Sequence, residues 1–173
     1  MQQAVNSVNS VDTQSDEAEQ YLTFMLSSKA YGLDILNIKE IIEYGDLTEV
    51  PMTPDFISGV INLRGSVVPV IDLSQRFSGA VTEHTKRTSI IILEVKNDDL
   101  MIEIGVTVDM VNEVLDIHPS EIEPPPALGN QIQTNFISGM AKVDGHFLIL
   151  LDIENILSID ELSMVGSMQR EEG

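Results

Sequence analysis

The chain has 173 residues, of which 43% are hydrophobic, which is enough for one full domain or two small ones. Lys plus Arg number 9 against 28 Asp plus Glu, and the formal net charge of −19 makes nucleic acid and anionic lipid surfaces poor partners. No cysteine is present, so disulfides are excluded. The start of the chain is neither basic nor apolar, and no segment approaches the ~20 apolar residues of a membrane span. We therefore expect a cytoplasmic protein without membrane insertion.

Residues 1–19 are polar and acidic without periodicity, and they predict a disordered tail. The ordered part is expected over residues 20–158. It begins with YLTFMLS and YGLDI, which predict two strands around a turn. The next run, LNIKEIIEY, fits a short helix nearly as well as a strand, and PMTP ends it in either case.

A hairpin is predicted in the middle of the chain, with GVINL and SVVPVID as its arms. Arg64 and Gly65 form the turn, where Gly65 is free to take a positive φ. Pro69 cannot donate to a ladder, so it is expected at an edge or with its nitrogen toward open space. Asp72 then begins one short helical turn as its N-cap, and Gly79 ends it.

The second half of the chain continues the β pattern. TSIIILEV predicts a buried strand, an Asp98-Asp99 turn follows, and LMIEIGVTV alternates at period two. DMVNEVLDI, the proline-rich EIEPPPALG, a second hairpin and a capped turn at DIENIL complete the ordered part. Residues 159–173 predict a tail or a frayed helix.

An internal repeat links the two halves. The stretch FISGVINLRGSVVPVIDL, which begins at Phe56, returns as FISGMAKVDGHFLILLDI, which begins at Phe136. Upstream, GLDILNIKEII matches GVTVDMVNEVL, and the match pairs Glu40 with Glu113. Such a repeat predicts a duplicated, all-β architecture of two five-stranded closed barrels on a shared aliphatic core. We expect intertwined subdomains, approximately 32–87 and 21–31 plus 88–158.

Catalytic and metal-binding patterns are not found. His84, His118 and His146 lie far apart, and none has a second histidine at ligand spacing. The motifs GxSxG, GxGxxG and the Walker phosphate loop are absent. We therefore expect a protein that is not an enzyme and that holds neither a metal nor a cofactor.

Arg64 is the most informative charge, since it stands at the tip of an otherwise apolar hairpin. A solvated turn residue is an equally good interpretation of it. However, Glu40 is a candidate partner if the glycine-led strand lies beside the hairpin, and a carboxylate would hold the guanidinium as a fixed fork. Ile38 would face the same way as Glu40 in a strand. An apolar residue beside a fixed ion pair is typical of a protein contact.

A second candidate surface is IEPPPALG, from Ile122 to Gly129. Its prolines stiffen the loop and expose Leu128, although a rigid linker explains the same residues more simply.

YGLDILNIKEI, GVINLRGSVVPVIDL and the second hairpin closely resemble the CheW family of bacterial chemotaxis adaptors, from about Tyr21 to Leu157. The resemblance implies two five-stranded SH3-like barrels without catalysis. It also implies an adaptor between the cytoplasmic tip of chemoreceptors, the methyl-accepting chemotaxis proteins, and the C-terminal regulatory domain of the histidine kinase CheA. One departure is Asp72-Leu73-Ser74, where the family often has Asp-Leu-Arg.

The resemblance also implies two sets of binding residues. The receptor-facing set carries over to Ile38, Glu40, Gly59, Asn62, Arg64, Ser89 and Val114. The kinase contact carries over to the loop with Glu123 and Leu128. Two alternatives stay open, namely the adaptor module of a CheV-type protein, which carries a receiver domain after it, and a small-molecule-binding or hydrolytic barrel.

Overall fold

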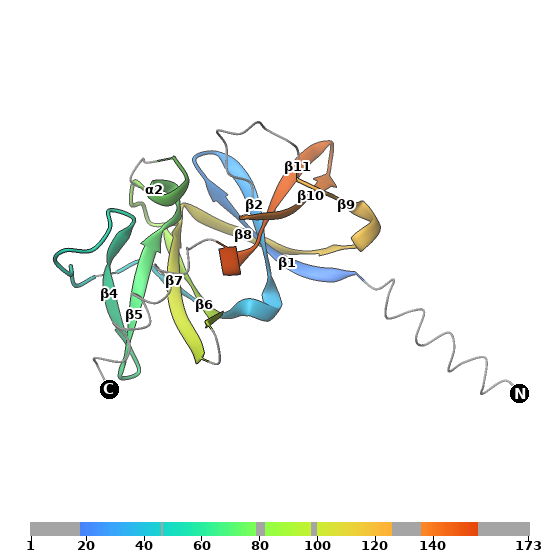
Figure 1. The fold of residues 1–173 in the computed structure, drawn as a ribbon. Helices are drawn as coiled ribbons and strands as arrows, with labels where there is room; N and C mark the ends of the chain where they lie inside the picture. Colours follow the sequence, from blue (N-terminus) through green and yellow to red (C-terminus); the bar gives the residue numbers. More distant parts are fainter. Residues whose placement is uncertain (1–17, 46, 79–81, 98–99, 126–135, 156–173) are drawn as a thin grey trace, which may run out of the picture.

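The computed structural model describes residues 18–45, 47–78, 82–97, 100–125 and 136–155, most of which are in β-strands (Figure 1). The strands in chain order are β1 Glu19–Leu26, β2 Lys29–Asp34, β3 Ile38–Glu43, β4 Ile57–Leu63, β5 Ser66–Asp72, β6 Ser89–Asn97, β7 Leu100–Val108, β8 Met110–Ile117, β9 Ile122–Glu123, β10 Ile137–Val143 and β11 His146–Leu151. Between and after them lie the helix α2 Leu73–Ser78 and the 3-10 turns η1 Ile35–Asn37, η2 Pro119–Glu121 and η3 Ile153–Asn155. In the part of the chain that the structure describes, no helix is long and apolar enough to cross a membrane.

The strands form two sheets, which confirms the expected all-β, two-unit architecture. One is five-stranded in the order β3-β6-β7-β5-β4, and the other is six-stranded in the order β8-β1-β2-β11-β10-β9. Figure 1 shows β4 to β7 on one side of the molecule and β1, β2 and β9 to β11 on the other.

The expected closure of the two barrels is not complete, although the SH3-like fold class holds. In the first unit the chain after β3 returns to the edge of β4 only as a single bridge between Thr48 and Val60. In the second unit the strand that returns, β9, has two residues. Prolines follow both short contacts, at Pro51 and at Pro124, and proline has no N–H to extend a ladder.

The assignment of strands to the two units also differs from the expected division. The hairpin β6–β7 lies in the sheet of β3, β4 and β5, and the whole of β2 lies in the other sheet. Two parallel ladders cause this, because β5 pairs with β7 and β11 pairs with β2. Each repeat therefore contributes its first hairpin to the sheet of the other repeat. Parallel partners are distant in sequence, so a local pattern does not reveal them.

The duplicated hairpins have matching backbones. Arg64 and Gly65 have φ values of 55° and 88°, and Asp144 and Gly145 have values of 51° and 81°. Two consecutive positive φ values are the signature of a type I′ hairpin turn. The backbone N–H of Asp72 donates to the Phe56 carbonyl at 2.8 Å, and Asp152 donates to Phe136 at the same distance. The repeat read from the sequence is thus a repeat of structure.

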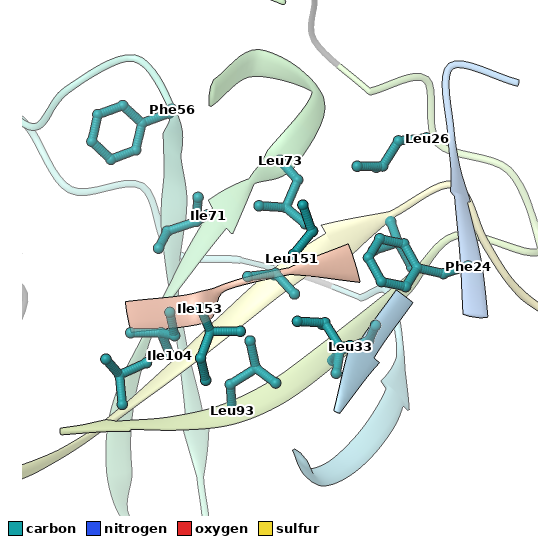
Figure 2. Packing of buried hydrophobic residues seen from close by; sticks show 14 of the residues in the cluster. Phe24, Leu26, Leu33, Phe56, Ile71, Leu73, Leu93, Ile104, Leu151 and Ile153 are labelled. Atoms are coloured by element: carbon teal, nitrogen blue, oxygen red, sulfur yellow. The ribbon is translucent and has the colours of Figure 1, made fainter. Parts of the chain in front are cut away.

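The main core lies between the two sheets and is almost entirely aliphatic (Figure 2). It takes Phe24 and Leu33 from one unit and Leu93 and Ile104 from the other, all fully buried. Smaller clusters lie on the opposite face of each sheet, around Val70 and Ile92 in the first unit and around Tyr21, Ala141 and Leu150 in the second. This confirms the shared aliphatic core.

Local predictions around the turns hold in part. The ambiguous run LNIKEIIEY contains η1 and then β3, and Asp34 caps the 3-10 turn by accepting from the Leu36 N–H at 2.9 Å. Pro69 lies directly before the β5–β7 ladder, which begins at Val70. Asp72 accepts from the Gln75 N–H at 3.2 Å as the predicted cap of α2. The Asp98-Asp99 turn, residues 1–17 of the expected tail and residues 159–173 lie outside the described residues.

The tyrosines offer a test of this packing. All three are described, and burial is the first cause that raises the pKa of each, to about 12 for Tyr21, whose hydroxyl also donates to Glu19 at 3.1 Å. At the pKa of a free tyrosine, which is about 10, we expect the native chain to show less phenolate absorbance in the near ultraviolet than the unfolded chain. The contribution of Tyr21 to folding stability is present below pH ~10, the pKa of a free tyrosine. It is lost as the pH rises toward about 12, because in that range the phenol has lost its proton in the unfolded chain but keeps it in the folded one.

The chain has no tryptophan, so the absorbance change reports tyrosine alone. The control is the same titration in denaturant, where all three phenols should ionise together near pH ~10. The variant Tyr21→Phe should remove the last step of the native titration. A native curve that matches the denatured curve would contradict the packing of these three side chains.

Candidate protein-binding site

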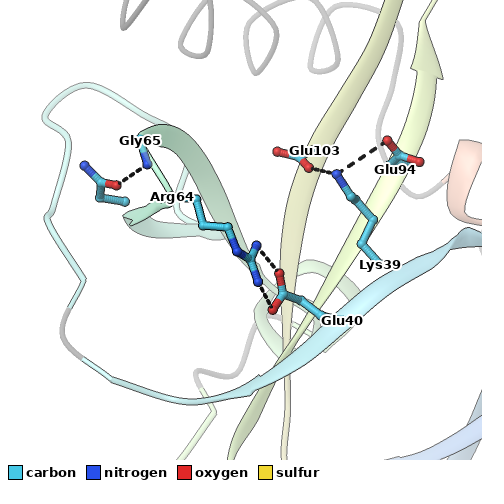
Figure 3. Close-up of polar contacts among 7 residues, drawn as sticks. Lys39, Glu40, Arg64, Gly65, Glu94 and Glu103 are labelled. Atoms are coloured by element: carbon cyan, nitrogen blue, oxygen red, sulfur yellow. Dashed lines mark hydrogen bonds and ion pairs between the residues drawn. The ribbon is translucent and has the colours of Figure 1, made fainter.

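Arg64 and Glu40 form a bidentate ion pair between the β4–β5 turn and β3 (Figure 3). Arg64 Nη1 donates to Glu40 Oε2 at 2.6 Å, and Nη2 donates to Oε1 at 2.8 Å. The turn itself is held by Asn62, whose Oδ1 accepts from the Gly65 N–H at 2.9 Å. The predicted partnership of Arg64 with Glu40 is therefore confirmed, and the guanidinium has a fixed orientation.

The ion pair is charged over the whole physiological pH range. The hydrogen bond from Arg64 holds the pKa of Glu40 below its usual value, and Glu40 raises the pKa of Arg64. The Arg64 side chain is 71% exposed and the Glu40 side chain 26% exposed. A pair this open to solvent adds little to folding stability, so its main physical effect is to orient the arginine toward solvent.

The position of Ile38 differs from the expected one. Ile38 pairs with Leu93 of β6 and Glu40 pairs with Ile92, so the register shifts between them as in a β-bulge. Because Leu93 and Ile92 are consecutive, they face opposite sides of the sheet. Ile38 packs against the main core together with Leu93, whereas Glu40 faces the side of Ile92. The bulge therefore separates the two side chains that strand alternation would place together.

A second group of charges lies beside the Arg64 pair and was missed by sequence reasoning. The Lys39 ammonium contacts Glu103 and lies 3.7 Å from Glu94 (Figure 3). The hydrogen bond with Glu103 is the first cause that raises the pKa of Lys39. The sequence signal was weak, because Glu94 and Glu103 meet only through the antiparallel pairing of β6 with β7. We call Lys39, Glu40, Arg64, Glu94 and Glu103 the charged cluster.

Gly59 serves the scaffold and is not at the surface. It is buried in β4 at a φ of 157°, and a Cβ there would lie 2.5 Å from the backbone oxygen of Thr48. Gly139, its equivalent in the repeat, is crowded in the same way, because a Cβ would lie 2.5 Å from Ile122 Cγ2. Both glycines let the returning segment cross the hairpin closely.

The other predicted residues lie apart from the charged cluster. Ser89 begins β6 opposite Glu43, and its hydroxyl donates to the Arg87 carbonyl at 3.2 Å. Val114 is half exposed on β8, in the other sheet. Glu123 is exposed on β9. Leu128 lies outside the described residues.

The equivalent place in the second unit has a different chemistry. Asp144 stands where Arg64 stands, and Glu113 stands where Glu40 stands, so no ion pair can form between them. Both line an open groove of about 480 Å³ whose walls include Met25, Ala30 and Leu148. The described residues hold no group of three His, Asp or Glu side chains that could bind a metal ion.

Comparison with known proteins shows the family of this chain. The family model for the CheW-like domain matches residues 20–161. The chain is 35% identical over 152 residues to the chemotaxis protein CheW of Klebsiella aerogenes, which covers 88% of this chain and 89% of that protein. It also resembles the crystal structure of the scaffolding protein CheW from Thermoanaerobacter tengcongensis, with a TM-score of 0.74, 36% identity and coverage of 83% and 90% of the two chains.

The CheV-type alternative is the weaker one. A CheV protein of Helicobacter pylori is 30% identical over 138 residues, and the match covers 78% of this chain but 42% of that protein. The CheW relatives are matched over about nine tenths of their length, as the Klebsiella protein shows with 89%. From the family model, these relatives and the shared fold, the chain belongs to the CheW family, whose members are non-enzymatic scaffold proteins of chemotaxis.

Proposed function

We propose that this protein couples the cytoplasmic tip of chemoreceptors to the histidine kinase CheA, as a non-catalytic adaptor in cytoplasmic receptor arrays. Membership of the CheW family supports the adaptor role. The observation that carries the receptor-facing site is the bidentate Glu40–Arg64 pair, which presents a fixed and exposed guanidinium at a hairpin tip.

The chemistry of Arg64 suits a protein partner. Two of its N–H groups are bound to Glu40, and the guanidinium carries five N–H donors, so the remaining donors are free to meet carbonyl or carboxylate oxygens. Arginine is also frequent among the few residues that carry most of the binding energy of a protein interface. The receptor site accordingly consists of Arg64, Glu40 and Asn62, with Val114 and Ser89 as outlying contacts and Ile38 and Gly59 as support.

The internal repeat strengthens the case for this hairpin. The second hairpin keeps the same turn and the same backbone φ values, but it has Asp144 in place of Arg64. The fold therefore forms with an acid at this position, and Arg64 is not needed to make the turn. A residue that the scaffold does not require is a better candidate for partner binding.

The kinase contact is proposed at a different surface, on the loop that begins at Glu123. Glu123 is exposed on the short strand β9, at the edge of the six-stranded sheet, whereas Arg64 belongs to the five-stranded sheet. Two partners can then bind at once. An adaptor that holds both makes the kinase equilibrium depend on the receptor conformation, with a coupling free energy of about 1–3 kcal/mol.

Co-sedimentation with receptor-bearing membranes tests the proposal. The purified chain should sediment with membranes that contain receptors, and addition of CheA should increase its retention because both partners then bind it. Membranes without receptors are the control, and the chain should stay in the supernatant with them. If the chain bound neither receptors nor CheA, the adaptor function would be rejected and the unrelated small-molecule alternative would be favoured.

A further inference from the structure

The charged cluster contains an arrangement that needs Lys39. Glu94 and Glu103 stand directly opposite each other on β6 and β7, and like charges in such a cross-strand pair repel. Lys39 reaches across from β3 and contacts both carboxylates. Its side chain is 42% exposed, so the contact lies at the surface and not in the core.

Glu103 is also within electrostatic range of Arg64. Its charge contributes to the raised pKa of Arg64, after the larger contribution of Glu40. Lys39 in turn contributes to the lowered pKa of Glu40, its neighbour in the chain. Two carboxylates therefore act on Arg64, Glu40 through hydrogen bonds and Glu103 through its charge, and Lys39 binds the second of them. Without Lys39, Glu103 would compete with Glu40 for the guanidinium.

The second unit shows that the fold does not require these charges. The pairing of Met25 with Ala30 on β1 and β2 corresponds to the pairing of Glu94 with Glu103 on β6 and β7. Asn112 takes the place of Lys39 in the repeat. These three residues line the open groove described above. The same scaffold thus forms with apolar and neutral side chains, and the charges of the first unit are available for recognition.

We propose that Lys39 is a positioning residue of the receptor-facing site, which holds Glu103 and Glu94 so that Arg64 stays on Glu40 and points toward the receptor. This inference rests on the proposed function of that site. It adds a role for a residue that does not itself touch the partner.

The test is the affinity of the full chain for a soluble cytoplasmic fragment of the chemoreceptor, measured without CheA. Lys39→Gln should weaken binding by about three- to tenfold, in the range of coupling between neighbouring charges. Glu103→Gln alone should bind like the unchanged protein. The double variant Lys39→Gln with Glu103→Gln should recover most of the affinity, because the competing carboxylate is gone.

Three further variants separate positioning from other effects. Lys96→Gln removes the same charge from an exposed position on β6, two residues beyond Glu94, and should leave affinity unchanged. Lys39→Arg should keep the affinity. Lys39→Gln leaves the Glu94–Glu103 pair without its cation, so its thermal unfolding midpoint should fall only slightly. The variant should still be fully folded at the temperature of the binding assay, which excludes loss of the fold as the cause of weaker binding.

The outcomes distinguish this inference from the proposed function. If Arg64→Ala binds the receptor fragment normally, the receptor site is assigned wrongly. If Arg64→Ala loses binding but Lys39→Gln does not, only the positioning role is wrong. The positioning role is also rejected if Glu103→Gln fails to rescue Lys39→Gln.

Discussion

Arg64→Glu should reduce receptor-dependent activation of CheA by at least about tenfold. The substitution removes the fixed guanidinium and places a second carboxylate beside Glu40, where Arg64 now makes its two hydrogen bonds. The receptor then meets a negative charge at the position of its proposed contact. The measurement is CheA autophosphorylation in arrays reconstituted from receptors, kinase and the purified variant.

The fold should tolerate this change. The second hairpin already carries Asp144 at the position of Arg64, and Glu113 stands at the position of Glu40, with a turn of nearly the same φ values as the first. The ion pair is also solvent-exposed, and such pairs contribute little to stability. The thermal unfolding midpoint of Arg64→Glu should therefore stay close to that of the unchanged protein, and a loss of activity will report on binding.

Two comparison variants sharpen the result. Lys142→Glu changes the net charge by the same amount on the second hairpin, and it should keep full activation, since Lys142 is exposed at the position equivalent to Asn62. The exchange Glu40→Arg with Arg64→Glu rebuilds an ion pair with reversed polarity. It should remain inactive if the receptor recognises the guanidinium at the hairpin tip. Full activation by Arg64→Glu alone would show that the receptor site lies elsewhere.

Gly59→Ala should destabilise the protein by about 2–4 kcal/mol, the largest stability effect we expect from one methyl group. The new Cβ would lie 2.5 Å from the Thr48 carbonyl oxygen, which is backbone and cannot rotate away. The φ of 157° adds strain for a residue with a side chain. Relief of the clash would break the Thr48–Val60 bridge, which joins the returning segment to β4.

Other glycines of the chain provide matched controls for Gly59→Ala. A Cβ at Gly45 would meet nothing within 4 Å and the backbone needs no positive φ, so Gly45→Ala should be neutral. At Gly65 the space is also open but φ is 88°, so only backbone strain of about 1 kcal/mol is expected. Urea unfolding should find Gly45→Ala the most stable of the three variants, Gly65→Ala the next and Gly59→Ala the least stable. Equal stability of Gly59→Ala and Gly45→Ala would contradict the close crossing at Thr48.

Several features could be predicted from the sequence because they depend on neighbours in the chain. The hairpin turn at Arg64 and Gly65 follows from turn chemistry, and the strand periods follow from alternation. The repeat was visible because both copies need glycine at the same positions, where the backbone is crowded or has a positive φ, as Gly59 and Gly139 show. The Glu40–Arg64 pair was predicted through the assumption that the two segments are adjacent, and the fold places them so.

What the sequence by itself determined is therefore the local content: an acidic chain with an aliphatic core, two copies of one β-corner, and an arginine in only one of them. The tertiary structure alone decided three features. It exchanged the first hairpins of the repeats between sheets through two parallel ladders, it turned Ile38 toward the core through a bulge, and it brought Lys39 to Glu94 and Glu103. The physical reason is common to all three, because each depends on the register between strands that are far apart in sequence, and that register is set by packing of the shared core and not by local pattern.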